Sequence, residues 1–402
     1  MFRFRWVDCQ LRILEGCITP NAVRAALREL PRDLDSIYLR ILDTIPERQR
    51  QYVRRAMNWL AFSAEPLTLG QLAEAIVIEY DVNKYGEDPE TLFDPESLMS
   101  ICPSLISFEE VRDDKYFSLE SRRLRLAHSS VKEYLISERI AQGPCAYYHI
   151  SEDKANLLMG HACLSRILQH SAQGIILEKK IEETSFLYHS ARYWFRYIGA
   201  IEDTAPTPVS DAASKVLKLG QCWLDIYDPD QPPQRALSGT RVYSSAIYYS
   251  SLLNLVTCCK LLLYRGDAVN LNSRGGQYGN ALQAAAAAGN ESVVQLLLEH
   301  GAEANAEGGD YGNALQAGAR AGSERVVCLL LERGADVNAQ GGFYGNALQA
   351  AAQGGNESLV HLLLERRAEV NSHGGQYGNA LQAAAQAGNE SIFRLLLECG
   401  AE

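Results

Sequence analysis

The heptapeptide Tyr-Gly-Asn-Ala-Leu-Gln-Ala at residues 278–284 is the most informative stretch of this 402-residue chain. The same seven residues begin again at Tyr311, Tyr344 and Tyr377, and each copy starts 33 residues after the last. An alanine-rich stretch, a glycine and a Leu-Leu-Leu-Glu run follow each copy. A fixed period of this length is typical of supersecondary units that stack on one another. The sequence therefore predicts a repeat structure that acts through its surface.

Each unit contains the signals for two helices. In the first full copy, Asn280 can cap a helix that is rich in alanine, and Gly289 can end it in a left-handed turn. Glu291 then favours the start of a second helix, where its carboxylate faces the positive end of the helix dipole, and Gly301 closes that helix. Residues 305–311 are rich in turn formers and suit a hairpin-like finger that leads into the next unit.

This 33-residue unit, with Leu-Leu-Leu-Glu-x-Gly-Ala-x-x-Asn at its end, resembles the ankyrin repeat. Where that family has Thr-Pro-Leu-His at the start of the first helix, this chain has Asn-Ala-Leu-Gln, for example at residues 346–349. A degenerate copy begins near Tyr243, and the last copy stops at 402. We therefore expect about five ankyrin repeats over residues 241–402, which implies a module that binds a protein partner in a concave groove.

Positions that differ between the near-identical units are the candidates for binding, because packing imposes sameness and solvent does not. The tyrosines at the finger positions are identical in every unit, so we expect them to pack repeat against repeat. Phe343 is the first candidate for an anchor residue, because it is aromatic where its equivalents are polar. The variable positions are Gln277, Asp310, Phe343 and Gln376 on the fingers, and Ala287, Arg320, Gln353 and Gln386 on the first helices.

Residues 1–240 show no period and indicate a mainly α structure. Proline and capping signals predict helices over 19–30, 34–45 and 48–62 and a short helix after Thr68. A helix over 95–102, a strand over 105–108, a wing of strands over 116–119 and 124–127, and a closing helix over 129–140 complete the order of a winged helix. The predicted domains are a helical lid over 1–48, a winged helix over 49–140, a helical arm or linker over 141–240 and the ankyrin solenoid over 241–402.

Four motifs give the first half a resemblance to fungal NACHT-type proteins of the signal-transducing NTPase class. They are Phe-x-Phe-x-Trp-x-x-Cys-Gln-Leu at 2–11, Leu-Pro with Asp-Leu and Tyr-x-x-Ile-Leu at 30–42, Trp-Leu-Ala-Phe-Ser with Pro-Leu-Thr-Leu at 59–69, and Leu-Ala-His-Ser-Ser-Val-Lys-Glu-Tyr-Leu at 126–135. The region resembles the NACHT-associated winged helix of the GPI inositol-deacylase type. In that family the nucleotide-binding core, lid, winged helix, helical arm and sensor array follow one another, which implies a signalling scaffold.

Phosphate-binding and hydrolase motifs are missing from this sequence. A nucleotide-hydrolysing core needs a Gly-x-x-x-x-Gly-Lys-[Ser/Thr] loop, and a serine hydrolase of this kind needs a Gly-x-Ser-x-Gly elbow, but neither occurs. We therefore expect no enzymatic activity, no cofactor and no metal. The resemblance implies one candidate nucleotide contact, His128, whose other interpretation is a structural histidine at a strand-to-helix junction. The alternative function is a nucleotide-switched NTPase whose core lies outside these residues.

A winged helix can also read DNA. The candidate recognition helix over 70–78 offers Gln71, but Glu74 would repel phosphates, and the net charge of −11 argues against nucleic acid as the main partner. Basic residues gather on the wing instead. The sequence has no long apolar run that would cross a membrane, and we expect a cytoplasmic protein. The last helix should leave apolar side chains uncovered and favour self-association; these are Ile392, Phe393, Leu396 and Leu397.

Overall fold

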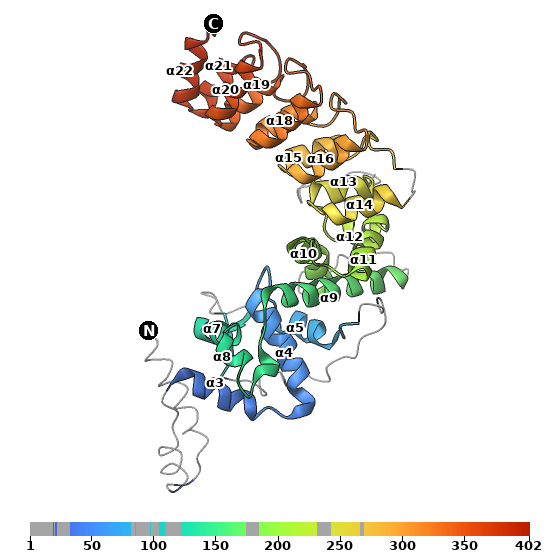
Figure 1. Ribbon diagram of the computed structural model, residues 1–402, viewed down its shortest axis with the longest axis vertical. Coiled ribbons are helices and arrows are strands. Elements are labelled where there is room, and N and C mark those ends of the chain that lie inside the picture. The colour runs from blue at the N-terminus through green and yellow to red at the C-terminus, as the bar shows by residue number, and fades with distance from the viewer. Residues whose placement is uncertain are drawn as a thin grey trace. The chain divides into compact units, whose positions relative to one another are not determined.

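The computed structural model describes residues 33–81, 104–109, 122–173, 185–230, 243–265 and 269–402, together with single positions at 19, 21, 85 and 97. Its contacts divide the chain into two units, Met1–Ile201 and Glu202–Glu402, which are described separately. Helices dominate both units (Figure 1). The mainly α fold predicted from the sequence is confirmed.

The first unit is helical apart from a small sheet. The expected helices over 34–45 and 48–62 are present, and strand and helix follow where the sequence placed them after residue 104. The expected elements over 19–30, 95–102 and 116–119 fall outside the described residues, apart from single positions at 19, 21 and 97. The elements are α3 (Leu34–Asp43), α4 (Glu47–Phe62), α5 (Leu69–Val77), β1 (Ile106–Phe108), β2 (Leu124–Leu126), α7 (Ser129–Leu135), α8 (Glu138–Ala141), a 3₁₀ turn (Ala146–Tyr148), α9 (Glu152–Ala172) and α10 (Phe186–Ala200).

The sheet of this unit consists of two strands among the described residues. β1 and β2 are antiparallel, with Ser107 opposite Arg125, and Thr68 forms an isolated bridge to Arg123, which directly precedes β2. Thr68 also opens α5 through a capping box with Gln71, so one residue links the sheet edge to a helix start. α4 leads into this bridge and α5 leaves it.

The loop after α4 is fastened to β2 and to α10 by one carboxylate. Glu65 accepts hydrogen bonds from Arg123 and from the hydroxyl of Tyr193. Next to it, the buried His189 contacts Tyr197 through a 3.1 Å hydrogen bond at Nε2 and lies edge-on to Trp59. Burial lowers the pKa of His189 to about 4, so this aromatic cluster contains a neutral histidine at neutral pH. These contacts hold α10 against α4 and α5.

The second unit is a stack of helix pairs joined by fingers, which lie along one side of the pairs in Figure 1. α11 (Thr207–Lys218) and α12 (Gln221–Leu224) come first, and α11 packs on the first pair. These two helices lie within the segment predicted as an arm over 141–240, yet their contacts are with the repeats. The pairs are α13 (Ala246–Leu252) with α14 (Val256–Tyr264), α15 (Ala281–Ala287) with α16 (Glu291–Glu299), α17 (Ala314–Ala321) with α18 (Glu324–Glu332), α19 (Ala347–Gly354) with α20 (Glu357–Glu365), and α21 (Ala380–Ala387) with α22 (Glu390–Glu398).

The caps proposed for each unit are present. Asn280 Oδ1 accepts the N–H of Gln283 at 2.9 Å, and the same bond recurs in the three later copies. Gly322 adopts a left-handed φ of 75° after α17. The prediction for the last helix was partly wrong, because Ile392 and Leu396 are buried against the neighbouring helices. Of the four side chains expected to be uncovered, only Leu397 is largely exposed.

One position after a second helix carries a strained residue. Arg367 has φ 67°, whereas its equivalents Gly301, Gly334 and Gly400 are glycines with φ between 84° and 89°. A side chain in the left-handed region costs roughly 1 kcal/mol. We expect Arg367→Gly to raise the free energy of unfolding of the repeat unit by up to about 1 kcal/mol, measured by urea unfolding. A lowered value would show that the arginine makes a contact that outweighs its strain.

Candidate protein-binding surface

The fingers form a continuous backbone ladder. The N–H of Asp310 donates to the carbonyl of Gln277 at 2.9 Å, Phe343 donates to Asp310 at 2.8 Å and Gln376 donates to Phe343 at 2.9 Å. All four variable finger positions thus belong to one hydrogen-bonded row. Backbone bonds hold them at fixed spacing whatever their side chains are, which leaves the side chains free to vary.

The tyrosines of the fingers stack in a column beneath this row. Successive rings lie 5.7 Å, 5.7 Å and 5.9 Å apart, with interplanar angles of 12°, 15° and 24°. Offset stacking at this spacing stabilises aromatic pairs. The interpretation of these tyrosines as packing residues agrees with this geometry.

We call the surface formed by the four variable finger residues and the four variable first-helix residues the finger face.

A glutamine in each first helix joins one repeat to the next finger. Gln316 Nε2 donates to the carbonyl of Ala339 at 3.1 Å and to that of Gly345 at 3.3 Å. Gln283 and Gln349 make the equivalent pairs of bonds. Sequence reasoning noted this glutamine only as a departure from Thr-Pro-Leu-His. The presence of the same glutamine in every copy was the signal that its partner also recurs in every copy, and this partner is the backbone.

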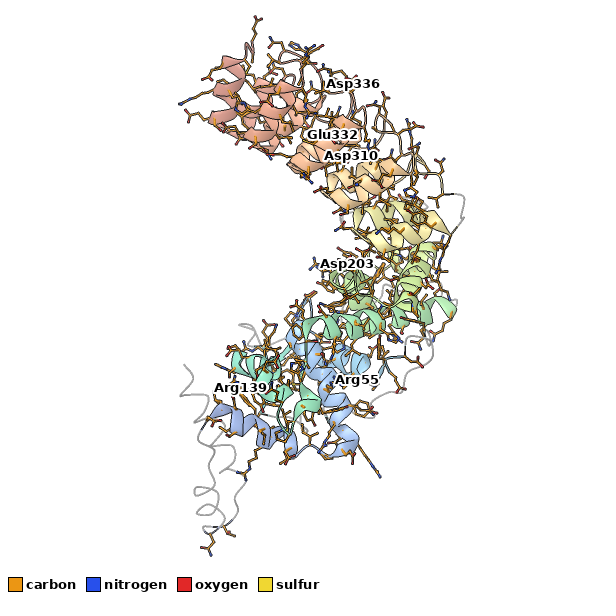
Figure 2. All side chains as sticks on the ribbon, viewed as in Figure 1. Arg55, Arg139, Asp203, Asp310, Glu332 and Asp336 are labelled. Carbon is orange, nitrogen blue, oxygen red and sulfur yellow. The ribbon has the colours of Figure 1, made fainter. Side chains whose placement is uncertain are left out.

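An asparagine row in the loops makes a second set of links that sequence reasoning missed. Asn305 Oδ1 accepts the N–H of Asp336 at 2.8 Å, and its Nδ2 donates to the carbonyl of Gly334 at 2.9 Å. Asn338 and Asn371 repeat this pattern at intervals of 33 residues. Figure 2 labels Asp310 and Asp336 in two successive loops. Together these ladders make the finger face a pre-organised surface.

The eight predicted binding positions lie on this face with different exposure. Asp310, Phe343, Gln376 and Gln386 are exposed, and the other four are partly buried. Arg320 connects the two halves of the face, since its Nε donates to the hydroxyl of Tyr344 at 2.8 Å. The end of α17 and the next finger therefore share one surface. Gln353 differs from the rest, because its Oε1 is buried without a hydrogen-bond partner in the described part of the chain.

Phe343 combines exposure with a fixed position. Its side chain is 46% exposed, and its ring lies edge-on to Tyr344 at 5.0 Å and to Tyr377 at 5.9 Å. The backbone of Phe343 is held on both sides by the finger ladder. An aromatic side chain that is already ordered loses little conformational entropy on binding.

A carboxylate accepts the hydrogen bond at the first finger of the ladder among the described residues. Asp230 is 4% exposed, and its Oδ2 accepts the N–H of Gln277 at 2.7 Å. Its Oδ1 accepts the hydroxyl of Tyr248 at 2.7 Å, and that hydroxyl accepts the N–H of Tyr278 at 3.2 Å. Burial raises the pKa of Asp230, while the bonds from Gln277 and Tyr248 lower it. Asp230 thus accepts the N–H of Gln277, whereas a backbone carbonyl accepts the equivalent N–H in each later finger.

The first residues of this unit also cap the degenerate repeat. Glu202 Oε1 accepts the N–H of Thr257 in the first turn of α14 at 2.5 Å. Burial raises the pKa of Glu202 to about 7, and the bond from Thr257 opposes this shift. The segment from Glu202 to Asp230 therefore completes the N-terminal end of the stack.

The raised pKa of Glu202 predicts how the stability of the fold depends on pH. Because the folded pKa exceeds the ordinary value of 4.5, this carboxyl contributes stability that is complete below about pH 4.5 and is lost as the pH rises from there through about 7. We expect Glu202→Gln to match the wild type at pH 4 and to be more stable by about 1 kcal/mol or more at pH 8. Thermal unfolding at both pH values measures this, and a constant difference between the two proteins would contradict it.

His128 lies at the strand-to-helix junction and caps α7. Its Nδ1 accepts the N–H of Ser130 at 3.1 Å and lies 2.7 Å from the Ser130 hydroxyl, which in turn contacts Tyr38 at 2.8 Å. Acceptance at Nδ1 places the proton of a neutral ring on Nε2. The geometry agrees with the structural interpretation of this residue, and the nucleotide contact implied by resemblance stays untested.

The helix considered for DNA reading is a buried element. α5 has seven of its nine residues buried, and the candidate base reader Gln71 is 6% exposed and bonds to Thr68. Glu74 pairs with Arg166, with 3.1 Å between Nη2 and Oε2. A helix that enters a major groove must present side chains to it. The burial of α5 therefore adds to the arguments against DNA reading, because the side chains that would have to face a groove are packed inside the protein.

Among the described residues, no three His, Cys, Asp or Glu side chains lie together as metal ligands would. Likewise, none of the helices in the described ranges is both long and apolar enough to span a bilayer.

Comparison with known proteins assigns the second unit to a class. Residues 246–341 and 340–402 match the family model for ankyrin repeats, so this part of the chain consists of ankyrin repeats. The human ASB11 ankyrin repeat domain is similar over 40% of this chain and 71% of its own, with 23% identity and a TM-score of 0.36.

Two curated fungal proteins are similar in sequence. The azaphilone pigments biosynthesis cluster protein L of Monascus ruber is 34% identical over 301 residues, which is 70% of this chain and 62% of that protein. The vegetative incompatibility protein HET-E-1 of Podospora anserina is 26% identical over 136 residues, which is 33% of this chain and 9% of that protein. The chain thus spans less than two thirds of the length of either relative.

Proposed function

We propose that this protein is a non-catalytic interaction module that binds a protein partner on its finger face. The observation that carries this proposal is the contrast on that face between an invariant, hydrogen-bonded scaffold and variable side chains. Backbone bonds and stacked tyrosines fix the four variable finger positions, and the first helices carry the other four. Such a surface presents recognition groups without paying much ordering entropy. Ankyrin repeats typically serve this purpose, and the expected compartment is the cytoplasm.

We further propose that the first half is the lid and winged helix of a NACHT-type signalling scaffold. The bridge of Thr68 to β2, the pairing of β2 with β1 and the flanking helices support a winged helix over 49–140. The similarity to HET-E-1 is compatible with a fungal relative of this kind. Residues 1–48 would be the lid and residues 141–201 the arm. Residues 202–230 are assigned to the solenoid rather than to the arm, because they cap it.

The alternative is a nucleotide-switched NTPase whose phosphate-binding core lies outside these residues. The motif around His128 favours it, since the resemblance gives that histidine a phosphate contact. The two proposals differ in calorimetry with ATP or GTP and magnesium. The proposed module should bind neither nucleotide, whereas a stoichiometric complex with this chain would favour the NTPase reading.

Affinity capture with the full chain as bait tests the interaction proposal. A partner that binds the finger face should be lost or weakened by about 1 kcal/mol or more in Phe343→Ala and in Arg320→Glu. The matched controls are Gln295→Ala and His361→Ala, exposed residues on second helices away from this face. Retention of the partner in both finger-face variants, or equal loss in all four, would overturn the proposal.

A further inference from the structure

The guanidinium of Arg320, on the finger face, is held in place through its Nε atom. Arg320 is the only cation among the eight variable positions. Its Nε bonds to the Tyr344 hydroxyl, and its Cζ lies 5.8 Å from the centre of that ring. Within the described ranges, its two terminal nitrogens make no hydrogen bond and have no carboxylate within 4 Å. The group is thus oriented by a tyrosine yet retains its capacity for an anion.

An apolar ring contacts the same tyrosine that holds this cation. Phe343 packs edge-on against Tyr344, whose hydroxyl bonds to Arg320. Tyr344 itself is 7% exposed and stacks between Tyr311 and Tyr377, so it cannot easily move. The spacing of the cation and the apolar ring is therefore set by a buried side chain before any partner arrives.

The surface next to the guanidinium is open. Gly354 follows the variable position in its helix, where the other copies have Ala288, Ala321 and Ala387. A Cβ added at Gly354 would lie 3.3 Å from the Arg320 carbonyl and 3.9 Å from Nη1. The absence of this methyl group leaves Nη1 without a contact from that position.

We propose that this part of the finger face binds a peptide segment that carries a carboxylate beside an apolar side chain; the inference rests on the proposed interaction function. A guanidinium donates two parallel hydrogen bonds to a carboxylate, and the Phe343 ring on the same tyrosine can cover an apolar group. A single cation with no second one at the variable positions suits a singly charged carboxylate better than a phosphate. The same scarcity of cations, with the net charge of −11, disfavours nucleic acid.

A peptide array with the labelled full chain tests this inference. Each immobilised ten-residue peptide has Gly/Ser flanks and two central positions, which are varied over all pairs of amino acids and include phosphoserine. Binding should be strongest where Asp or Glu adjoins Leu, Met or Phe. Arg320→Gln should lower binding of these peptides about ten-fold, to the level of their Asn and Gln analogues. Phe343→Gln should instead abolish the preference for the apolar residue.

Both substitutions introduce a residue that two other repeats already have at the same position, so the fold should tolerate them. These residues are Gln353 and Gln386 for the first substitution, and Gln277 and Gln376 for the second. Selection of basic pairs, stronger binding of phosphoserine than of Glu, or an unchanged acidic preference in Arg320→Gln would overturn the inference. If no pair is selected while a captured partner still depends on Arg320 and Phe343, the carboxylate inference fails and the proposed function stands. If a captured partner binds equally well after both substitutions, the proposed function itself is wrong.

Discussion

Asp230→Ala is expected to lower the stability of the repeat unit by about 2 kcal/mol, because it leaves two buried donors without an acceptor. The N–H of Gln277 and the hydroxyl of Tyr248 both lose their bonds to this carboxylate. Part of this loss is offset, because the variant no longer buries an ionised carboxylate. The raised pKa of Asp230 shows that burying this charge is unfavourable. Urea unfolding gives the free energy, and hydrogen exchange should show faster exchange at Gln277 and Tyr278 than in the wild type.

Two further variants separate this role from a general effect of charge. Asp230→Asn retains one carbonyl oxygen for the N–H of Gln277, so its loss should be smaller. Asp310→Ala is the matched control, because Asp310 accepts the N–H of Phe343 through its backbone carbonyl and not through its side chain. It should change stability by less than about 0.5 kcal/mol. Equal losses in Asp230→Ala and Asp310→Ala would show that the carboxylate does not terminate the ladder.

The repeats could be predicted from the sequence because their signals are local and occur four times. Asn280 caps α15 through a residue three positions away, and Gly322 ends α17 through its own backbone. Arg367 was recognisable as the strained exception because three equivalent glycines define the rule. The finger tyrosines were assigned to packing for the same reason, since stacking one repeat on the next requires the same ring in each.

The sequence could not predict contacts that are made by segments outside the repeats, because such contacts leave no recurring pattern. Asp230 lies 47 residues before its partner Gln277, in a segment without repeats, so nothing in the pattern connects them. Segment 202–230 was therefore placed in an arm, although Glu202 and Asp230 bond to the solenoid. For α5, the sequence shows the polar residue Gln71 but not that the residue turns back to cap its own helix. At the finger face, variability selected Arg320 and Phe343, while the tyrosine that orients both became visible only in the structure.

Gln316→Ala is expected to destabilise the repeats by about 3 kcal/mol. Gln316 is fully buried, and its loss leaves a cavity and removes the donor for the carbonyls of Ala339 and Gly345. Urea unfolding measures the free energy, and hydrogen exchange over 311–345 should locate the loss.

Gln382→Ala provides an internal control with the same local sequence. Gln382 occupies the equivalent position in α21, but its side chain is exposed and no described finger follows it, so the change should cost less than about 0.5 kcal/mol. Gln316→Leu fills most of the cavity without restoring the hydrogen bonds, and should still cost more than about 1 kcal/mol. If Gln316→Leu were as stable as the wild type, the glutamine would act by its volume alone. If Gln382→Ala cost as much as Gln316→Ala, the effect would arise within the helix and not from the bonds that join one repeat to the next.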